Sequence, residues 1–325
     1  MRKSEVIQAW KSILSGRRPS LAIEITRECP LRCPGCYAYE EGHVGGMNLR
    51  QLHDKRGEQL VQGVLALVDE YRPLHLSIVG GDPLVRHREV TQLLPQLDAR
   101  GIHVQVVTSA FRPIPQEWMS LKRLNIVVSI DGLQPEHDAR RKPATYERIL
   151  DSIRGQQVTV HCTITGQMMK QQHYLEDFIE YWSARPEVKK IWMSMFTPQV
   201  GAEAPEILTG EERVRAVKEL MRLRTVYPKL DMPEGLIKEF LQPPASPQEC
   251  IFAQTTHTIS ADLKSKVTPC QFGGNPDCSQ CGCIASMGLA AVGNYKLALG
   301  ITAGDVYWAS WSLSKAVRKK LRRAA

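Results

Sequence analysis

Long apolar runs are missing from this chain. It contains no stretch of about 18 or more uninterrupted apolar residues, so no membrane-spanning helix is predicted. The N-terminal residues 1–10 are too polar and too broken for a signal peptide. The sequence also shows no internal repeat, Walker loop, hydrolytic triad or cobalamin-binding extension. These absences indicate a cytoplasmic globular protein outside the repeat and P-loop classes.

Excess positive charge is confined to one end of the chain. The formal net charge is +8 over 325 residues. Six of these charges fall in the last eleven residues, where no acidic residue opposes them: Lys315, Arg318, Lys319, Lys320, Arg322 and Arg323. The remainder carries only +2, so no surface for nucleic acid is expected.

Short apolar segments alternate with helical patterns. The predicted strands are residues 21–25, 74–79, 102–108, 125–130, 158–165 and 190–196. The predicted helices are residues 58–71, 88–100, 115–122, 146–154, 173–184 and 210–227, and a short amphipathic helix at 6–14 is expected to pack on the sheet domain. Such alternation is typical of an α/β fold with a parallel sheet. Six units indicate a partial (β/α)6 TIM-type barrel rather than a closed eight-stranded one.

Cysteine is the most informative residue type. There are nine cysteines, an odd number, and eight lie in two tight groups, which in a reducing compartment favours metal or cluster ligation over disulfides. Cys29, Cys33 and Cys36 form a CxxxCxxC run directly after the first predicted strand. Three thiolates at this spacing can hold three corners of a [4Fe–4S] cube and leave the fourth iron open, whereas a structural site is normally closed.

Two alternatives for this run are three ligands of a structural zinc site and three buried thiols. Pro30 and Pro34 make the run a loop, which speaks against buried helical cysteines. The run at 26–37, including the aromatic Tyr37, resembles the cluster-binding signature of the radical S-adenosylmethionine (SAM) enzymes.

Two further motifs end predicted strands and extend this resemblance. Gly80-Gly81-Asp82-Pro83 resembles the family's GGEP motif, with Asp82 in place of Glu. Paired glycines allow close approach of a ligand, and their carbonyls can accept hydrogen bonds from the SAM amino group. An ordinary β–α turn is the alternative.

The second motif runs from Ser129 to Arg141 and resembles the SxDG segment of members with SPASM or twitch extensions. The resemblance implies that Ser129 and Arg141 bind the SAM carboxylate or ribose, with Arg140 as the runner-up; an arginine fork suits a carboxylate. A cap or turn role is the alternative for Asp131. The residues implied to bind SAM are Tyr37, Gly80, Gly81, Asp82, Ser129, Asp131 and Arg141. Residues 193–196 are assigned either to an adenine pocket or to the core.

The second cysteine group comprises Cys250, Cys270, Cys278, Cys281 and Cys283. It resembles a SPASM or twitch extension, although Ser265 stands where a glycine is usual. Five cysteines suffice for one auxiliary [4Fe–4S] cluster, with the first four as the preferred ligands and Cys283 as a replacement or extra. Zinc and no metal are the alternatives. Cys162, inside a predicted strand, is expected to be a buried small hydrophobe.

The resemblance and a Pro-rich boundary at 242–249 divide the chain into four parts. These are an N-terminal helix (1–18), the radical SAM partial barrel (19–241), an irregular cluster-binding region (242–304) and a basic amphipathic tail (305–325). The tail suits a peripheral contact with an anionic membrane, docking to an acidic electron donor, or a terminal helix packed on the barrel. Glu40, Glu41 and His43 are expected to form a solvated loop, with substrate contact as the alternative.

The function that the resemblance implies is oxidoreductase-type radical chemistry. A reduced [4Fe–4S] cluster cleaves SAM to a 5′-deoxyadenosyl radical, which abstracts hydrogen from a substrate C–H group. The expected partners are SAM, a flavodoxin- or ferredoxin-type electron donor and an unidentified organic substrate. The short segment before the first strand favours a small-molecule or lipid-like substrate. The alternatives are a peptide (RiPP or protein) maturase of the SPASM type and a non-catalytic, metal-stabilised binding protein on the same barrel.

Overall fold

One parallel sheet organises the molecule, which is known from a computed structural model that describes residues 3–143, 146–297 and 300–324. Its strands are β1 (Ser20–Glu24), β2 (His75–Val79), β3 (His103–Thr108), β4 (Leu124–Ser129), β5 (Val158–Ile164), β6 (Val188–Met195) and β7 (Thr256–Ile259). They lie in the order β6-β5-β4-β3-β2-β1-β7, and each pair is parallel. The six predicted strands are confirmed to within two residues. The six strands of the predicted barrel are β1 to β6, and β7 of the C-terminal extension adds a seventh strand at the edge of the sheet.

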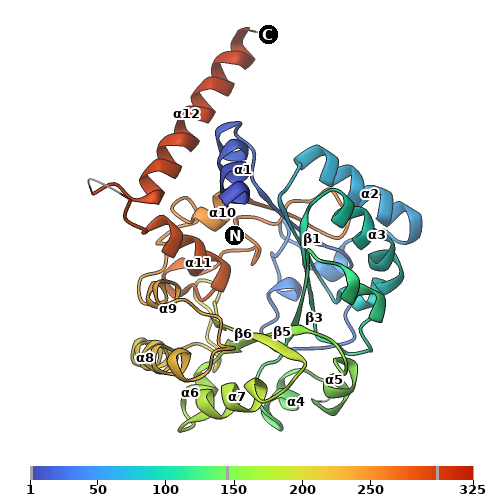
Figure 1. Ribbon diagram of the computed structural model, residues 1–325, viewed down its shortest axis with the longest axis vertical. Helices are drawn as coiled ribbons and strands as arrows, with labels where there is room; N and C mark the ends of the chain where they lie inside the picture. The colour runs from blue at the N-terminus through green and yellow to red at the C-terminus, as the bar shows by residue number, and fades with distance from the viewer. Residues whose placement is uncertain (1–2, 144–145, 298–299, 325) are drawn as a thin grey trace.

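Crossover helices cover the outer side of the sheet (Figure 1). They are α2 (Gly57–Tyr71), α3 (His87–Ala99), α4 (Glu136–Arg140), α5 (Tyr146–Ser152), α6 (Gly166–Met169), α7 (Tyr174–Ser183) and α8 (Gly210–Val226). Short 3₁₀ helices fill the connections: η1 (Tyr37–Tyr39), η2 (Leu49–Gln51), η3 (Pro83–Arg86) and η4 (Gln116–Ser120). The helix predicted at 115–122 is thus only the 3₁₀ turn η4. α8 begins at a capping box, in which Thr209 and Glu212 each accept from the other's backbone N–H.

The two faces of the sheet differ in polarity. Alternate residues such as Ile23, Ile78 and Val128 are fully buried in the main core beneath the helices. The residues between them are polar on several strands: Glu24, Ser77, Gln105, Ser129, His161 and Thr163. A parallel strand buried between two apolar layers would be apolar on both faces. The polar face therefore marks the side of the sheet on which a polar ligand can be bound.

The C-terminal extension joins both edges of the sheet. It follows α9 (Glu234–Glu239) and contains α10 (Ile251–Thr255), η5 (Cys278–Gln280) and α11 (Ile284–Gly293), and its strand β7 pairs with β1 at one edge. At the other edge, the Met195 N–H donates to Gly282 O and the Gly282 N–H donates to the Thr197 hydroxyl. The prediction of an irregular region is therefore wrong for β7 and α11.

The N-terminal helix α1 (Lys3–Leu14) packs against α12 (Ala303–Ala324). Ile13, Tyr307 and Trp311 form a small core of their own, separate from the main core. We predicted that this helix packs on the sheet domain, but it packs on α12 instead. α12 then extends away from the body (Figure 1). None of the described helices is both long and apolar enough to cross a bilayer.

Candidate functional site

The loop that carries Cys29, Cys33 and Cys36 (residues 26–37), called here the first cysteine loop, follows β1 at the carboxyl edge of the sheet. Burial, with a further contribution from the neighbouring cysteines, raises the pKa of the Cys29 thiol to about 12 and that of Cys36 to about 11. For Cys33, burial raises the pKa and Arg141 works against the rise. The three thiols are thus close enough to act on one another. Holding them as thiolates requires a cationic centre, because buried negative charges must be compensated.

A charge network anchors the start of this loop. The Thr26 hydroxyl and the Arg27 N–H both donate to Asp54 Oδ2, at 2.7 and 3.3 Å. Arg86, at the end of η3, donates to the same oxygen at 2.9 Å and lies 3.2 Å from Glu28. The side chain of Asp54 is 3% exposed. The sequence did not predict this anchor, because nothing in the cysteine motif indicates that Asp54 folds back and binds the residues at its start.

Gly80 and Gly81 are required by close packing of the turn after β2 against this loop. Gly80 has φ +102°, and a Cβ there would lie 2.7 Å from the Glu24 Cα. A Cβ on Gly81 would overlap the Glu28 carbonyl. The Gly81 N–H donates to Thr26 O at 2.8 Å, and the Asp82 N–H to Glu28 O at 2.9 Å. Only glycine permits this approach.

Asp82 braces the same turn. Its buried carboxylate accepts hydrogen bonds from the Leu84 N–H, the Thr108 hydroxyl, and both the N–H and the hydroxyl of Ser109. Four donors saturate most of the acceptor capacity of a carboxylate. The Asp82 carboxylate therefore holds β2, β3 and η3 together at the carboxyl edge of the sheet.

The third predicted motif brings two arginines beside the cysteine loop. Asp131 accepts from Arg140 Nε at 3.1 Å and from Arg141 Nε at 2.9 Å. The N-cap of the following helix α4 is Pro135, so Asp131 does not cap that helix. Burial acts to raise the pKa of Asp131, but Arg141 and Arg140 outweigh it and lower the pKa. Arg140 also binds Glu206 at 3.0 Å. Among the described ion pairs, Arg141 binds Asp131 only. It acts to lower the pKa of both Cys33 and Cys36, whereas Arg140 acts on Cys33 alone and less strongly. Ser129, the last residue of β4, pairs with His161 of β5.

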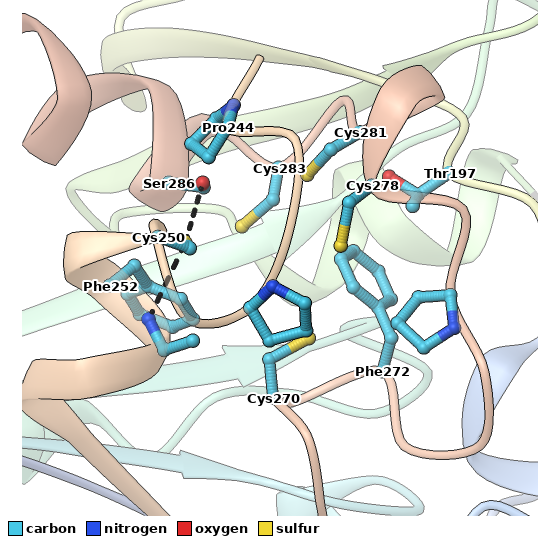
Figure 2. A pocket seen from close by; sticks show the side chains of 13 residues that line it. Thr197, Pro244, Cys250, Phe252, Cys270, Phe272, Cys278, Cys281, Cys283 and Ser286 are labelled. Atoms are coloured by element: carbon cyan, nitrogen blue, oxygen red, sulfur yellow. Dashed lines mark hydrogen bonds between the residues drawn. The ribbon is translucent and has the colours of Figure 1, made fainter.

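The second cysteine group lines one pocket (Figure 2). Its five members are Cys250, Cys270, Cys278, Cys281 and Cys283, with Phe252, Phe272 and several prolines around them. The sulfurs of Cys270, Cys278, Cys281 and Cys283 point toward a common space (Figure 2). Cys250 Sγ lies 3.1 Å from the Ser286 hydroxyl, and Cys250 is near enough to raise the pKa of each of the other four thiols. Burial raises the pKa of Cys270 to about 12 and of Cys278 to about 11.

Both donor sets consist of thiols, which can bind an iron–sulfur cluster or zinc. Among the described residues, no group of three or more His, Cys, Asp or Glu is placed to hold one metal ion. Thiolates of a cubane cluster bind separate irons, so they surround a larger group than a zinc ion. Both cysteine groups consist purely of soft thiol donors, which is the chemistry such clusters select.

Tyr37 and His43 connect the two cysteine groups. The Tyr37 ring meets Phe272 edge to face at 5.2 Å, and burial followed by nearby negative groups, Cys36 and Cys270 among them, raises the pKa of its hydroxyl. His43 is 1% exposed and binds Glu24, so the prediction of a solvated loop is wrong for this residue. The Glu24–His43 pair was missed, since only the tertiary fold brings residues 24, 43 and 272 together.

The remaining candidates lie mostly in the core. Met193 and Met195 are buried beneath the helices, which assigns them to the core, while Phe196 touches the position a Gly35 Cβ would occupy at 3.1 Å. Cys162 is a buried core residue, as predicted. On the polar face, burial lowers the pKa of His161 to about 4, and His161 Nε2 lies 2.8 Å from the Ser194 hydroxyl.

Much of the sheet domain is similar in sequence to known proteins. Residues 23–166 match the family model described as the Radical SAM superfamily. The chain is also similar to the 7-carboxy-7-deazaguanine synthase of Hyperthermus butylicus, with 32% identity over 106 residues. That alignment covers 31% of this chain and 39% of the relative.

Solved structures share the fold over most of the chain. Native anSMEcpe with bound AdoMet has a TM-score of 0.57 at 14% identity, covering 78% of this chain and 75% of that one. SuiB of Streptococcus suis has a TM-score of 0.54 at 16% identity, covering 82% and 64%. SuiB bound to its precursor peptide SuiA has a TM-score of 0.53 at 14% identity, covering 88% and 68%. At these identities the likeness establishes the partial TIM-type fold.

Proposed function

Because residues 23–166 match the model of the Radical SAM superfamily, we propose that the chain is a SAM-cleaving enzyme that abstracts hydrogen from a substrate C–H group. When bound, the [4Fe–4S] cluster supplies the electron that cleaves SAM. Cys29, Cys33 and Cys36 hold three of its irons and leave one for SAM. A flavodoxin- or ferredoxin-type donor supplies the electron.

The observation that carries this proposal is the convergence of three motifs on one edge of the sheet. β1, β2 and β4 are parallel, so the residues after them lie at the same edge. Asp82, Asp131 and Arg141 all act on the pKa of Cys33. A structural site would need the thiols alone, whereas this edge also supplies an arginine fork for a carboxylate and a tightly packed double-glycine turn.

Each residue then has a definite task. Arg141 binds the SAM carboxylate or ribose with donors that Asp131 leaves available, and Asp131 orients its guanidinium. The carbonyls of Gly80 and Gly81 accept from the SAM amino group, and Ser129 contacts SAM from β4. Tyr37 shields the loop from the extension side. The polar face of the sheet, with His161 neutral at physiological pH, receives the substrate.

The extension is proposed to hold one auxiliary [4Fe–4S] cluster, with Cys250, Cys270, Cys278 and Cys281 as ligands and Cys283 as a spare. Zinc, which tetrahedral thiolates also suit, is the second candidate for this site. A small-molecule or lipid-like substrate remains the prediction. A peptide substrate is the second candidate, favoured because the peptide-bound SuiB structure matches 88% of this chain.

The test is the iron content and EPR spectrum of the anaerobically reconstituted protein, with and without SAM. The comparison is a Cys29→Ala/Cys33→Ala/Cys36→Ala variant, with Cys162→Ala as the matched control. We expect about eight irons per chain, falling to about four in the triple variant only, and a reduced-cluster signal that SAM perturbs. About four irons falling to none, with zinc present, would make the extension structural. Zinc alone with no response to SAM would refute the proposed activity.

Product analysis separates the substrate candidates. The reduced protein should form 5′-deoxyadenosine from SAM, and deuterium from the correct substrate should appear in that product. Candidate peptides and small organic molecules are assayed side by side. Absence of 5′-deoxyadenosine from a protein with an intact SAM-responsive cluster would favour the non-catalytic alternative.

A further inference from the structure

A buried ion pair lies between the two cysteine groups. Glu24 ends β1, five residues before Cys29, and His43 follows Cys36 by seven residues. The side chains are 2% and 0% exposed, and His43 Nε2 lies 2.6 Å from Glu24 Oε1. Neither residue belongs to a motif, and the proposed reaction assigns no task to either.

The hydrogen bonds of this pair reach into the extension on both sides. His43 Nδ1 lies 2.9 Å from the Phe272 carbonyl oxygen. Glu24 Oε2 accepts from the Ser260 hydroxyl, just beyond β7. Both ring nitrogens of His43 face acceptors, so both must donate, which is the arrangement of an imidazolium paired with a carboxylate. Removing either partner is energetically costly, because the charge of the other partner then stays buried without compensation.

The loop that His43 holds carries a candidate cluster ligand. Phe272 lies two residues after Cys270, and the Gly273 N–H donates back to Cys270 O at 3.0 Å. Gly273 has φ +64°, and a Cβ there would lie 2.6 Å from His43 Nδ1. The Tyr37 ring packs against Phe272 on the same side. Cys270 is therefore held by a loop that packs closely against His43.

The other cysteines of this group are held differently. Cys281 and Cys283 flank Gly282, which is hydrogen-bonded to Met195 at the end of β6. Cys250 is the N-cap of α10 and contacts Ser286 of α11. The carbonyl that accepts from His43 belongs to the Cys270 loop alone. Loss of the pair should thus move Cys270 and leave the other cysteines of the group in place.

We propose that Glu24 and His43 are positioning residues that fix Cys270 of the auxiliary site against the first cysteine loop. This inference rests on the proposed function for the identity of the group that Cys270 binds. It assigns the pair a role in orienting a ligand through its backbone, as outer hydrogen-bond partners commonly do at metal sites. The two cysteine groups are then built as one unit rather than as independent sites.

The experiment compares His43→Phe with Cys270→Ala in the full chain. His43→Phe keeps a buried ring and removes both hydrogen bonds. His43→Asn retains a donor near the Nδ1 position and is the conservative variant. His53→Phe, at an exposed histidine ten residues further on, is the control. The readouts are the EPR spectrum of each cluster, iron release to a chelator, and hydrogen exchange of residues 270–273 in the metal-free chain.

We expect His43→Phe to reproduce the altered auxiliary signal and faster iron release of Cys270→Ala, with the SAM-responsive signal unchanged. The double variant should add nothing, because both changes remove the same ligand. Exchange at residues 270–273 should accelerate at least about tenfold in His43→Phe and be restored in His43→Asn. His53→Phe should match the wild type in every readout.

Two outcomes would overturn the inference. One is wild-type exchange and a wild-type auxiliary signal in His43→Phe. The other is a full additional loss in the double variant, which would give His43 a separate role. A wild-type chain that takes up no cluster would end the proposed function, yet the exchange measurement on the metal-free chain would still decide whether His43 fixes the loop. If His43→Phe fails to fold, Glu24→Gln with the same exchange measurement replaces it.

Discussion

Replacing Gly81 by alanine tests how the first cysteine loop is held. The added Cβ would overlap the Glu28 carbonyl and approach the Tyr39 hydroxyl at 2.9 Å. Backbone cannot rotate aside as a flexible side chain can, so either the loop or the turn after β2 must move. Moving it breaks the bonds from the Gly81 N–H to Thr26 O and from the Asp82 N–H to Glu28 O.

The size of the effect follows from these contacts. Overpacking costs about 1–3 kcal/mol, and each lost backbone hydrogen bond costs about 0.5–1.5 kcal/mol. Undocking of the loop should therefore become easier by about 2–6 kcal/mol, which raises the undocked population at least about thirtyfold. Global stability falls by less if the loop undocks without the sheet, because the main core is untouched.

The assay pairs hydrogen exchange of residues 26–36 with iron uptake by the first cysteine group. Gly210→Ala is the matched control: Gly210 is the first residue of α8, and a Cβ there meets nothing within 4 Å. Alanine at that position is expected to be neutral or stabilising by up to about 1 kcal/mol. If Gly81→Ala shows the exchange and iron uptake of Gly210→Ala, the packing argument is refuted.

Three further predictions concern the charges and ligands of the site. Asp131→Asn leaves a buried guanidinium without its carboxylate and should cost about 3–5 kcal/mol of stability, measured by urea unfolding, and weaken SAM binding by Arg141; unchanged SAM affinity would contradict the assigned orientation. Burial acts to lower the pKa of His43, but Glu24 outweighs it and raises the pKa. The stabilisation is therefore complete below the unfolded pKa of about 6.5 and is lost as pH rises through the higher folded pKa, so the Tm difference between wild type and His43→Asn should shrink with rising pH. Cys283→Ala should retain auxiliary iron while Cys270→Ala alters the auxiliary signal; a loss of iron in Cys283→Ala would make Cys283 a ligand.

Much of the fold could be predicted because local patterns of apolar and polar residues determine it. Apolar strands near residues 75 and 158 alternate with amphipathic helices, and this periodicity alone indicates a parallel sheet. β7 escaped prediction for a physical reason: Thr256–Ile259 is short, follows directly on α10 and alternates polar with apolar residues only once. Its partner β1 lies more than 230 residues earlier, and only the folded chain brings the two together.

The candidate site divides in the same way. The sequence by itself determined the cysteine spacing, the double glycine and the SxDG segment, because thiol ligation, close packing and strand ends depend on residues near one another in the chain. Tertiary structure alone decided that Asp54 and Arg86 anchor the first loop, that Asp131 binds both arginines, and that His43 reaches Phe272. These contacts join side chains from separate elements, and burial makes each of them strong. No local pattern encodes them, since the partner of a buried charge is set by which loops meet at the edge of the sheet.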